Sequence, residues 1–131
     1  MKVVLDTNVV VSAFLVPHSK PATILQLALR QDFDICFNTA ILAEYEQVVC
    51  RDKFAGKINR KDVQRFFEIV RDVGVDIVSV ESNFDLPDET DRKFYDVAKT
   101  ANAYLVTGNA KHYPDEPFIV TPAQFLLLTE K

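Results

Sequence analysis

The sequence predicts an α/β fold: a three-layer α/β/α sandwich whose central sheet is mostly parallel and has four to five strands. Short runs rich in β-branched and aromatic residues recur along the chain, and between them apolar residues are spaced three and four apart. Almost continuously apolar strands that alternate with helices are typical of a parallel sheet covered on both faces.

The apolar runs are interpreted as strands. The first four cover residues 3–5, 33–37, 75–80 and 104–107, and residues 117–120 are a candidate fifth. Helices are predicted between them, around residues 24–28, at 41–49 after Thr39, from Asn59 until Gly74 ends the helix, at 91–101, and from Thr121-Pro122 through Leu128.

Bulk properties predict one domain over residues 1–131, because 131 residues of 48% hydrophobic composition can bury one sizeable core. No stretch approaches the roughly 18 apolar residues that a membrane span needs, and Asp6 interrupts the first apolar run too early for a signal peptide. We therefore expect no membrane association and a cytoplasmic location. Cys36 and Cys50 lack the spacing of a metal site, so we expect reduced thiols.

The net charge of −4 and the pI of 5.1 argue against a globally basic surface for nucleic acid. A metal site that gathers several acids would weaken this objection, because bound cations reverse the local field. Gross charge therefore does not decide the function.

Polar residues stand where strands and helices of the predicted fold meet. Asp6 directly follows the first strand, Asn109 follows the fourth, and Asp91 begins the helix that leads into the fourth. Ligands of parallel sheets bind at the carboxyl ends of strands, so these side chains could converge. Clustered carboxylates repel one another unless a hard cation such as Mg²⁺ or Mn²⁺ neutralises them, and such a metal could activate water at a phosphodiester.

Each residue considered alone has an ordinary explanation. Asp6 could cap the following helix, and Asp91 could stand at a helix start because the helix dipole favours a negative charge there. Asn109 could simply be a turn residue. Glu44 lies in a helix roughly 200° around from Glu46, so one of the two faces outward.

Taken together, the order of these motifs resembles the PIN-domain family over nearly the whole chain, and the small single-domain group often paired with antitoxins in particular. The resemblance is carried by Val3-Val4-Leu5-Asp6-Thr7-Asn8, Glu44 in an early helix, Asp91-Arg92-Lys93-Phe94, Ala103-Tyr104-Leu105-Val106-Thr107-Gly108-Asn109, and Thr121-Pro122-Ala123-Gln124-Phe125.

This resemblance implies an endoribonuclease that cuts single-stranded RNA with Mg²⁺ or Mn²⁺. It also implies a toxin role with an antitoxin protein as partner, and a homodimer. Asp6, Glu44 and Asp91 correspond to three catalytic, metal-binding acids, and Asn109 to a fourth position that is aspartate in many members. Asn109→Asp is therefore expected to tighten metal binding. The resemblance assigns supporting roles to Thr7, Asn8, Asp96 and Thr107, and Lys93, Lys111 and His112 are candidates for contacts with RNA phosphates.

Two other protein classes fit poorly. An aspartyl phosphatase needs Asp-x-Asp, and Asn8 stands where its second acid would be; a response-regulator receiver needs a phosphoacceptor where this chain has Phe37-Asn38-Thr39. The stronger alternative is a PIN-like module that binds RNA or a protein without cutting, which Asn109 favours. That alternative stays open.

Overall fold

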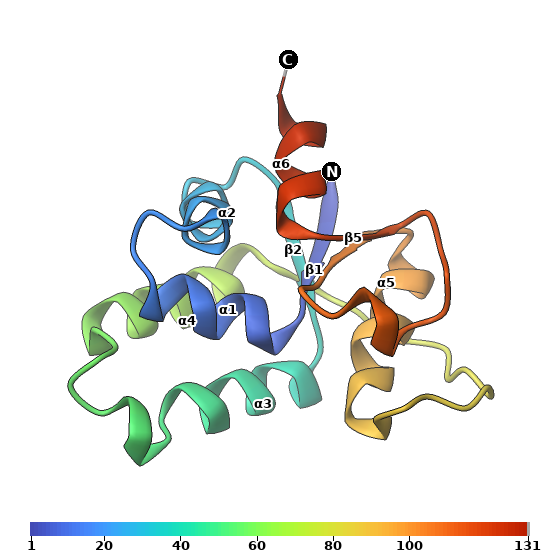
Figure 1. Cartoon of the computed structure of the whole chain (residues 1–131), viewed down its shortest axis with the longest axis horizontal. Coiled ribbons are helices and arrows are strands. Elements are labelled where there is room, and N and C mark those ends of the chain that lie inside the picture. Colours follow the sequence, from blue (N-terminus) through green and yellow to red (C-terminus); the bar gives the residue numbers. More distant parts are fainter. Residues whose placement is uncertain (131) are drawn as a thin grey trace.

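The computed structural model describes residues 1–130 and contains one sheet of five parallel strands in the order β3-β2-β1-β4-β5 (Figure 1). The strands are β1 (Lys2–Leu5), β2 (Asp34–Phe37), β3 (Val75–Asp76), β4 (Tyr104–Val106) and β5 (Ile119–Val120). The predicted α/β class with a parallel central sheet is confirmed.

Six α-helices flank the sheet, with α1 to α4 on one side of the strands and α5 on the other in the view of Figure 1. They are α1 (Thr7–Leu15), α2 (Lys20–Leu29), α3 (Thr39–Val49), α4 (Arg60–Val73), α5 (Arg92–Ala101) and α6 (Pro122–Thr129). Three short 3₁₀ turns join them: η1 (Asp52–Phe54), η2 (Glu89–Asp91) and η3 (Ala110–His112). Within residues 1–130, no helix has the length and apolar character needed to cross a membrane.

Polar side chains fix where several helices begin. The Asn38 amide oxygen accepts from the Ile41 N–H at 2.8 Å, and Asn59 does the same for the first turn of α4. Such caps satisfy N–H groups that have no partner inside the helix. Gly74 ends α4 as predicted, and a Cβ there would lie 2.3 Å from the Val70 carbonyl oxygen, so the close approach requires glycine.

Two predicted strands are shorter than expected. Of residues 75–80 only Val75 and Asp76 are paired, and of residues 117–120 only the last two. β3 lies at the edge of the sheet, and beyond it Val78 and Val80 are 94% and 75% exposed. Their β-branched side chains predicted a strand, but they bury no surface that would hold one in the sheet.

The core connects the central strand to the site. Val3, Val4 and Leu5 of β1 are at most 1% exposed. Tyr45 of α3 is fully buried, stacks on Phe94 of α5, and donates a hydrogen bond to the carbonyl of Leu5. This contact ties α3 and α5 to the end of β1, where Asp6 follows.

Candidate active site

A pocket of about 370 Å³ lies at the carboxyl end of β1, between the start of α1, one face of α3 and the turn η2. Asp6, Glu44 and Asp91 all line it. Three acids separated by up to 85 positions in the sequence are therefore brought to one cavity, at the edge of the sheet where ligands of parallel α/β folds bind.

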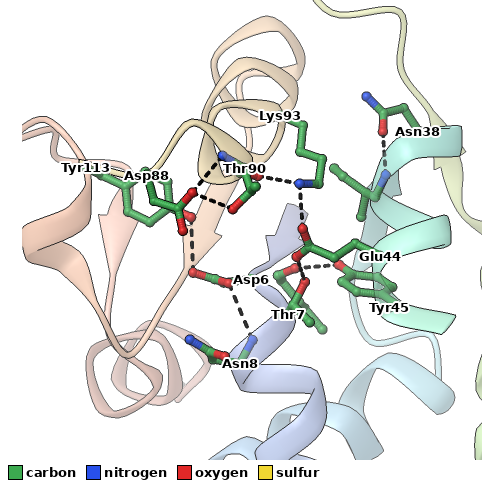
Figure 2. Close-up of polar contacts among 12 residues, drawn as sticks. Asp6, Thr7, Asn8, Asn38, Glu44, Tyr45, Asp88, Thr90, Lys93 and Tyr113 are labelled. Carbon is green, nitrogen blue, oxygen red and sulfur yellow. Dashed lines mark hydrogen bonds and ion pairs between the residues drawn. The ribbon is translucent and has the colours of Figure 1, made fainter. Parts of the chain in front are cut away.

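Asp6 is only 4% exposed and is held by hydroxyl groups. Its Oδ2 accepts hydrogen bonds from the Thr107 hydroxyl at 2.8 Å and from the Tyr113 hydroxyl at 3.0 Å. Its Oδ1 lies 3.4 Å from the Asn8 backbone nitrogen and caps α1 (Figure 2). The capping role and the place in the pocket are thus compatible, because the cap engages only Oδ1.

Glu44 projects from α3 toward the pocket, while Glu46 is exposed on another face. One Glu44 oxygen accepts a hydrogen bond from the Thr7 hydroxyl, and the other lies 2.6 Å from the Lys93 ammonium. Lys93 also donates to the carbonyl of Thr90 (Figure 2). The charge of Glu44 is therefore balanced by a cation of the chain itself.

Of the three acids, Asp91 at the end of η2 has the fewest polar partners for its carboxylate. Its side chain is 14% exposed, and its Oδ2 is buried without a hydrogen bond. His112 Nδ1 lies 3.5 Å away, an ion-pair contact if the ring is protonated but no hydrogen bond. Burial, followed by the negative charges of Asp6 and Asp88, raises the pKa of Asp91 to about 6.

The chemistry of these donors fits a hard divalent cation. The three acids supply only carboxylate oxygens, and the buried Oδ2 of Asp91 accepts no hydrogen bond. Within residues 1–130, however, no three His, Cys, Asp or Glu side chains already converge as a metal cluster. Glu44 is drawn to Lys93 instead, and Asp6 to two hydroxyls.

Several predicted site residues lie elsewhere. Asn109 does not line the pocket: the chain enters η3 after Gly108, and the Asn109 backbone N–H donates to Thr107 at 3.0 Å. Asp96 is buried one turn further along α5, where it accepts from the Ser82 N–H at 3.2 Å. Lys111 is exposed and outside the lining, whereas its neighbour His112 lines the pocket.

Sequence reasoning missed Tyr113 and gave Asp88 too small a part. Tyr113 is 7% exposed, and burial and the charge of Asp6 raise its pKa well above the ordinary range, so its hydroxyl stays a donor. Asp88, to which the sequence analysis assigned no role in the site, lines the pocket and accepts hydrogen bonds from the backbone and the hydroxyl of Thr90. These two hydrogen bonds lower the pKa of Asp88. For Tyr113, the signal available in the sequence was a tyrosine in a polar loop after a strand.

Comparison with known proteins agrees with this geometry. The profile of the PIN domain matches residues 2–111, a range that includes all three pocket acids. An uncharacterized protein of Methanocaldococcus jannaschii is 32% identical over 113 residues, which cover 83% of this chain and 71% of the relative. PIN domains are generally nucleases. The chain belongs to the PIN-domain family.

Proposed function

We propose that this protein is a divalent-metal-dependent endoribonuclease that cuts single-stranded RNA, with Mg²⁺ or Mn²⁺ as its cofactor. The observation that carries the proposal is the buried Oδ2 of Asp91, which accepts no hydrogen bond and lies in the same pocket as Asp6 and Glu44. A buried carboxylate oxygen without a donor is costly, and a cation would compensate it.

Asp6, Glu44 and Asp91 would hold the metal, which would activate water and offset the charge that develops on the phosphodiester. The chain's own residues prepare the site. Thr107 and Tyr113 fix the carboxylate of Asp6 through its Oδ2. Hydrogen bonds of this kind orient a metal ligand and sustain its affinity.

The Thr7 hydroxyl orients Glu44, as Thr107 and Tyr113 orient Asp6. The His112 side chain, 49% exposed beside Asp91, is accessible to a phosphate at the rim of the pocket. With Arg51, it is one of two basic residues in the pocket lining.

The test uses labelled single-stranded and hairpin RNAs with Mg²⁺, Mn²⁺ or chelator. We expect metal-dependent cleavage, with a loss of at least about hundredfold for Asp6→Asn and Asp91→Asn, since even partners of metal ligands typically contribute roughly 10- to 100-fold. Asp85→Asn, which removes an exposed acid that does not line this pocket, is the matched control. Cleavage that survives chelator or Asp6→Asn would refute the proposal.

The binding-only alternative is favoured by Asn109, which adds no carboxylate to the pocket, and by the pairing of Glu44 with Lys93. RNA that is bound but stays intact with Mn²⁺ would support that alternative.

The proposal extends, through the family resemblance, to a cytoplasmic toxin restrained by an antitoxin protein and to a homodimer. Leu127 and Leu128 of α6 are 67% and 45% exposed and would suit a contact with a second copy. Growth arrest on expression that Asp6→Asn relieves would support the toxin role. Light scattering of the purified protein tests the dimer.

A further inference from the structure

The basic residues of this acidic protein are unevenly distributed. The segment 51–71, here called the basic arm, contains seven of the fifteen Lys and Arg residues but only three of the nineteen Asp and Glu residues. The arm therefore carries a charge of +4, while the rest of the chain carries −8. All seven basic residues are exposed: Arg51, Lys53, Lys57, Arg60, Lys61, Arg65 and Arg71.

A groove of about 440 Å³ runs between the end of α3 and α4 within this arm. Arg51, Arg60 and Arg71 line it, over an apolar floor that includes Phe54 and Val63. Three acids, Glu46, Asp52 and Glu68, also line the groove. The one ion pair between these acids and the groove arginines joins Arg71 to Glu46 at 3.9 Å, with both side chains more than half exposed. Such surface pairs contribute little, so the arginines stay available to a ligand.

The groove and the acidic pocket lie on different faces of α3 and share one lining residue at the end of that helix. Glu44, Gln47 and Val48 of α3 line the pocket, whereas Val49 and Cys50 at the end of the same helix line the groove. Arg51 lines both. In Figure 1, α3 and α4 lie one above the other and are joined at the end of α3, where the basic arm begins.

The lysine nearest the acids is less available than the arginines of the groove. Lys93, a candidate for RNA phosphate from the sequence, is engaged with Glu44 and Thr90. A negatively charged ligand at this pocket therefore meets Arg51 as the link to further positive charge.

We propose that the groove of the basic arm holds the phosphate backbone of single-stranded RNA beside the acidic pocket, through Arg51, Arg60 and Arg71. This inference rests on the proposed function, because it takes RNA as the substrate. The lining itself balances three arginines against three acids, and the positive excess of the arm comes from basic residues around the groove. This surrounding charge favours RNA over a protein as occupant, since the arm is the positive region of an acidic molecule. Guanidinium groups suit phosphates because they can donate two parallel hydrogen bonds.

The experiment measures binding of labelled oligouridine by fluorescence anisotropy across a salt series, with wild-type protein in chelator so that RNA is not cut. The groove variant combines Arg51→Gln, Arg60→Gln and Arg71→Gln. The control variant combines Lys2→Gln, Lys20→Gln and Arg30→Gln, which removes the same charge from exposed positions outside the arm.

Each phosphate contact with a single strand contributes about 0.7 to the slope of log affinity against log salt, so three lost contacts should reduce the slope by about 2. The control should keep the wild-type slope. If the groove variant unfolds, Arg60→Gln alone should reduce the slope by about 0.7.

A wild-type slope in a folded groove variant would overturn the inference and mark the groove as a surface for a protein instead. If wild-type protein still cuts RNA in that case, the proposed function stands. Wild-type protein that neither binds nor cuts RNA overturns both.

Discussion

Replacing Asp91 by asparagine should remove most of the pH dependence that this pocket gives to the metal-free protein. Asp91 has its pKa raised from 3.8 to about 6, chiefly by burial. The folded state therefore favours the protonated carboxyl more than the unfolded state does. The stability that Asp91 contributes is fully present below pH 3.8 and is lost as the pH rises through about 6.

The size of the effect follows from the two pKa values. A rise from 3.8 to about 6 corresponds to roughly 3 kcal/mol at most, because one unit is about 1.4 kcal/mol. Between pH 4 and 7, wild-type protein should lose up to about 3 kcal/mol relative to Asp91→Asn. For a domain of this size that is a difference of roughly 10 °C in melting temperature.

The assay is a set of urea and thermal melts at pH values between 4 and 7 in chelator, for wild type, Asp91→Asn and the control Asp85→Asn. Any constant offset from the amide cancels, since only the change with pH is compared. Adding Mn²⁺ at neutral pH should make wild type the more stable of the two proteins. Wild type gains stability by binding the metal, whereas Asp91→Asn has lost a ligand. Parallel pH curves for wild type and Asp91→Asn would refute the argument that Asp91 is the uncompensated acid.

Three further changes test the neighbours of these acids. Tyr113→Phe removes a donor to the Asp6 carboxylate and should lower the free energy of unfolding, measured in urea, by about 1.5 to 3 kcal/mol. Hydrogen bonds to charged groups typically contribute this much. Lys93→Met removes the cation paired with Glu44, so it should lower the melting temperature without metal and tighten Mn²⁺ binding in calorimetric titration. Asn109→Asp should leave Mn²⁺ affinity nearly unchanged, because Asn109 lies outside the pocket lining, contrary to the expectation from sequence.

Controls separate these effects from general damage. Tyr95→Phe loses a hydroxyl contact with Glu116 outside the acidic pocket and should leave Mn²⁺ affinity unchanged. Lys111→Met removes an exposed charge near the site without an ion pair to Glu44. Equal Mn²⁺ affinity for the Lys93 and Lys111 variants would contradict the pairing argument. Tighter Mn²⁺ binding by Asn109→Asp would return that position to the metal shell.

Local sequence patterns predicted the strands well where both faces of the strand are buried. The runs at residues 3–5 and 33–37 are almost continuously apolar, and both are buried strands of the sheet. The run at residues 75–80 misled, because an edge strand followed by an exposed segment has the same β-branched composition as a buried strand. Strand ends depend on which neighbour supplies a partner, and that information is not local.

The order of elements along the chain predicted which acids lie at the site, but it did not predict their contacts with residues distant in sequence. Asp6 and Asp91 stand at element boundaries, and Glu44 was identified by family resemblance; all three do line one pocket. The hydroxyl of Tyr113 reaches Asp6 across 107 positions, and no sequence spacing predicts a contact of that range. The pairing of Lys93 with Glu44 likewise depends on how two helices meet, across 49 positions.

The charge of the whole chain does not decide the function, for a physical reason that the two surfaces make clear. At an ionic strength near 0.15 M, charges are screened over about 8 Å, so a phosphate at the basic arm responds mainly to Arg51, Arg60 and their neighbours. The net charge of −4 is the sum of an arm of +4 and a remainder of −8, two regions that a bound RNA strand would meet separately. At low salt the screening length grows to about 30 Å, and a bound strand would then also experience the acidic remainder. Recognition of RNA by such a protein therefore depends on where its charges lie, and its pI of 5.1 carries little information about that.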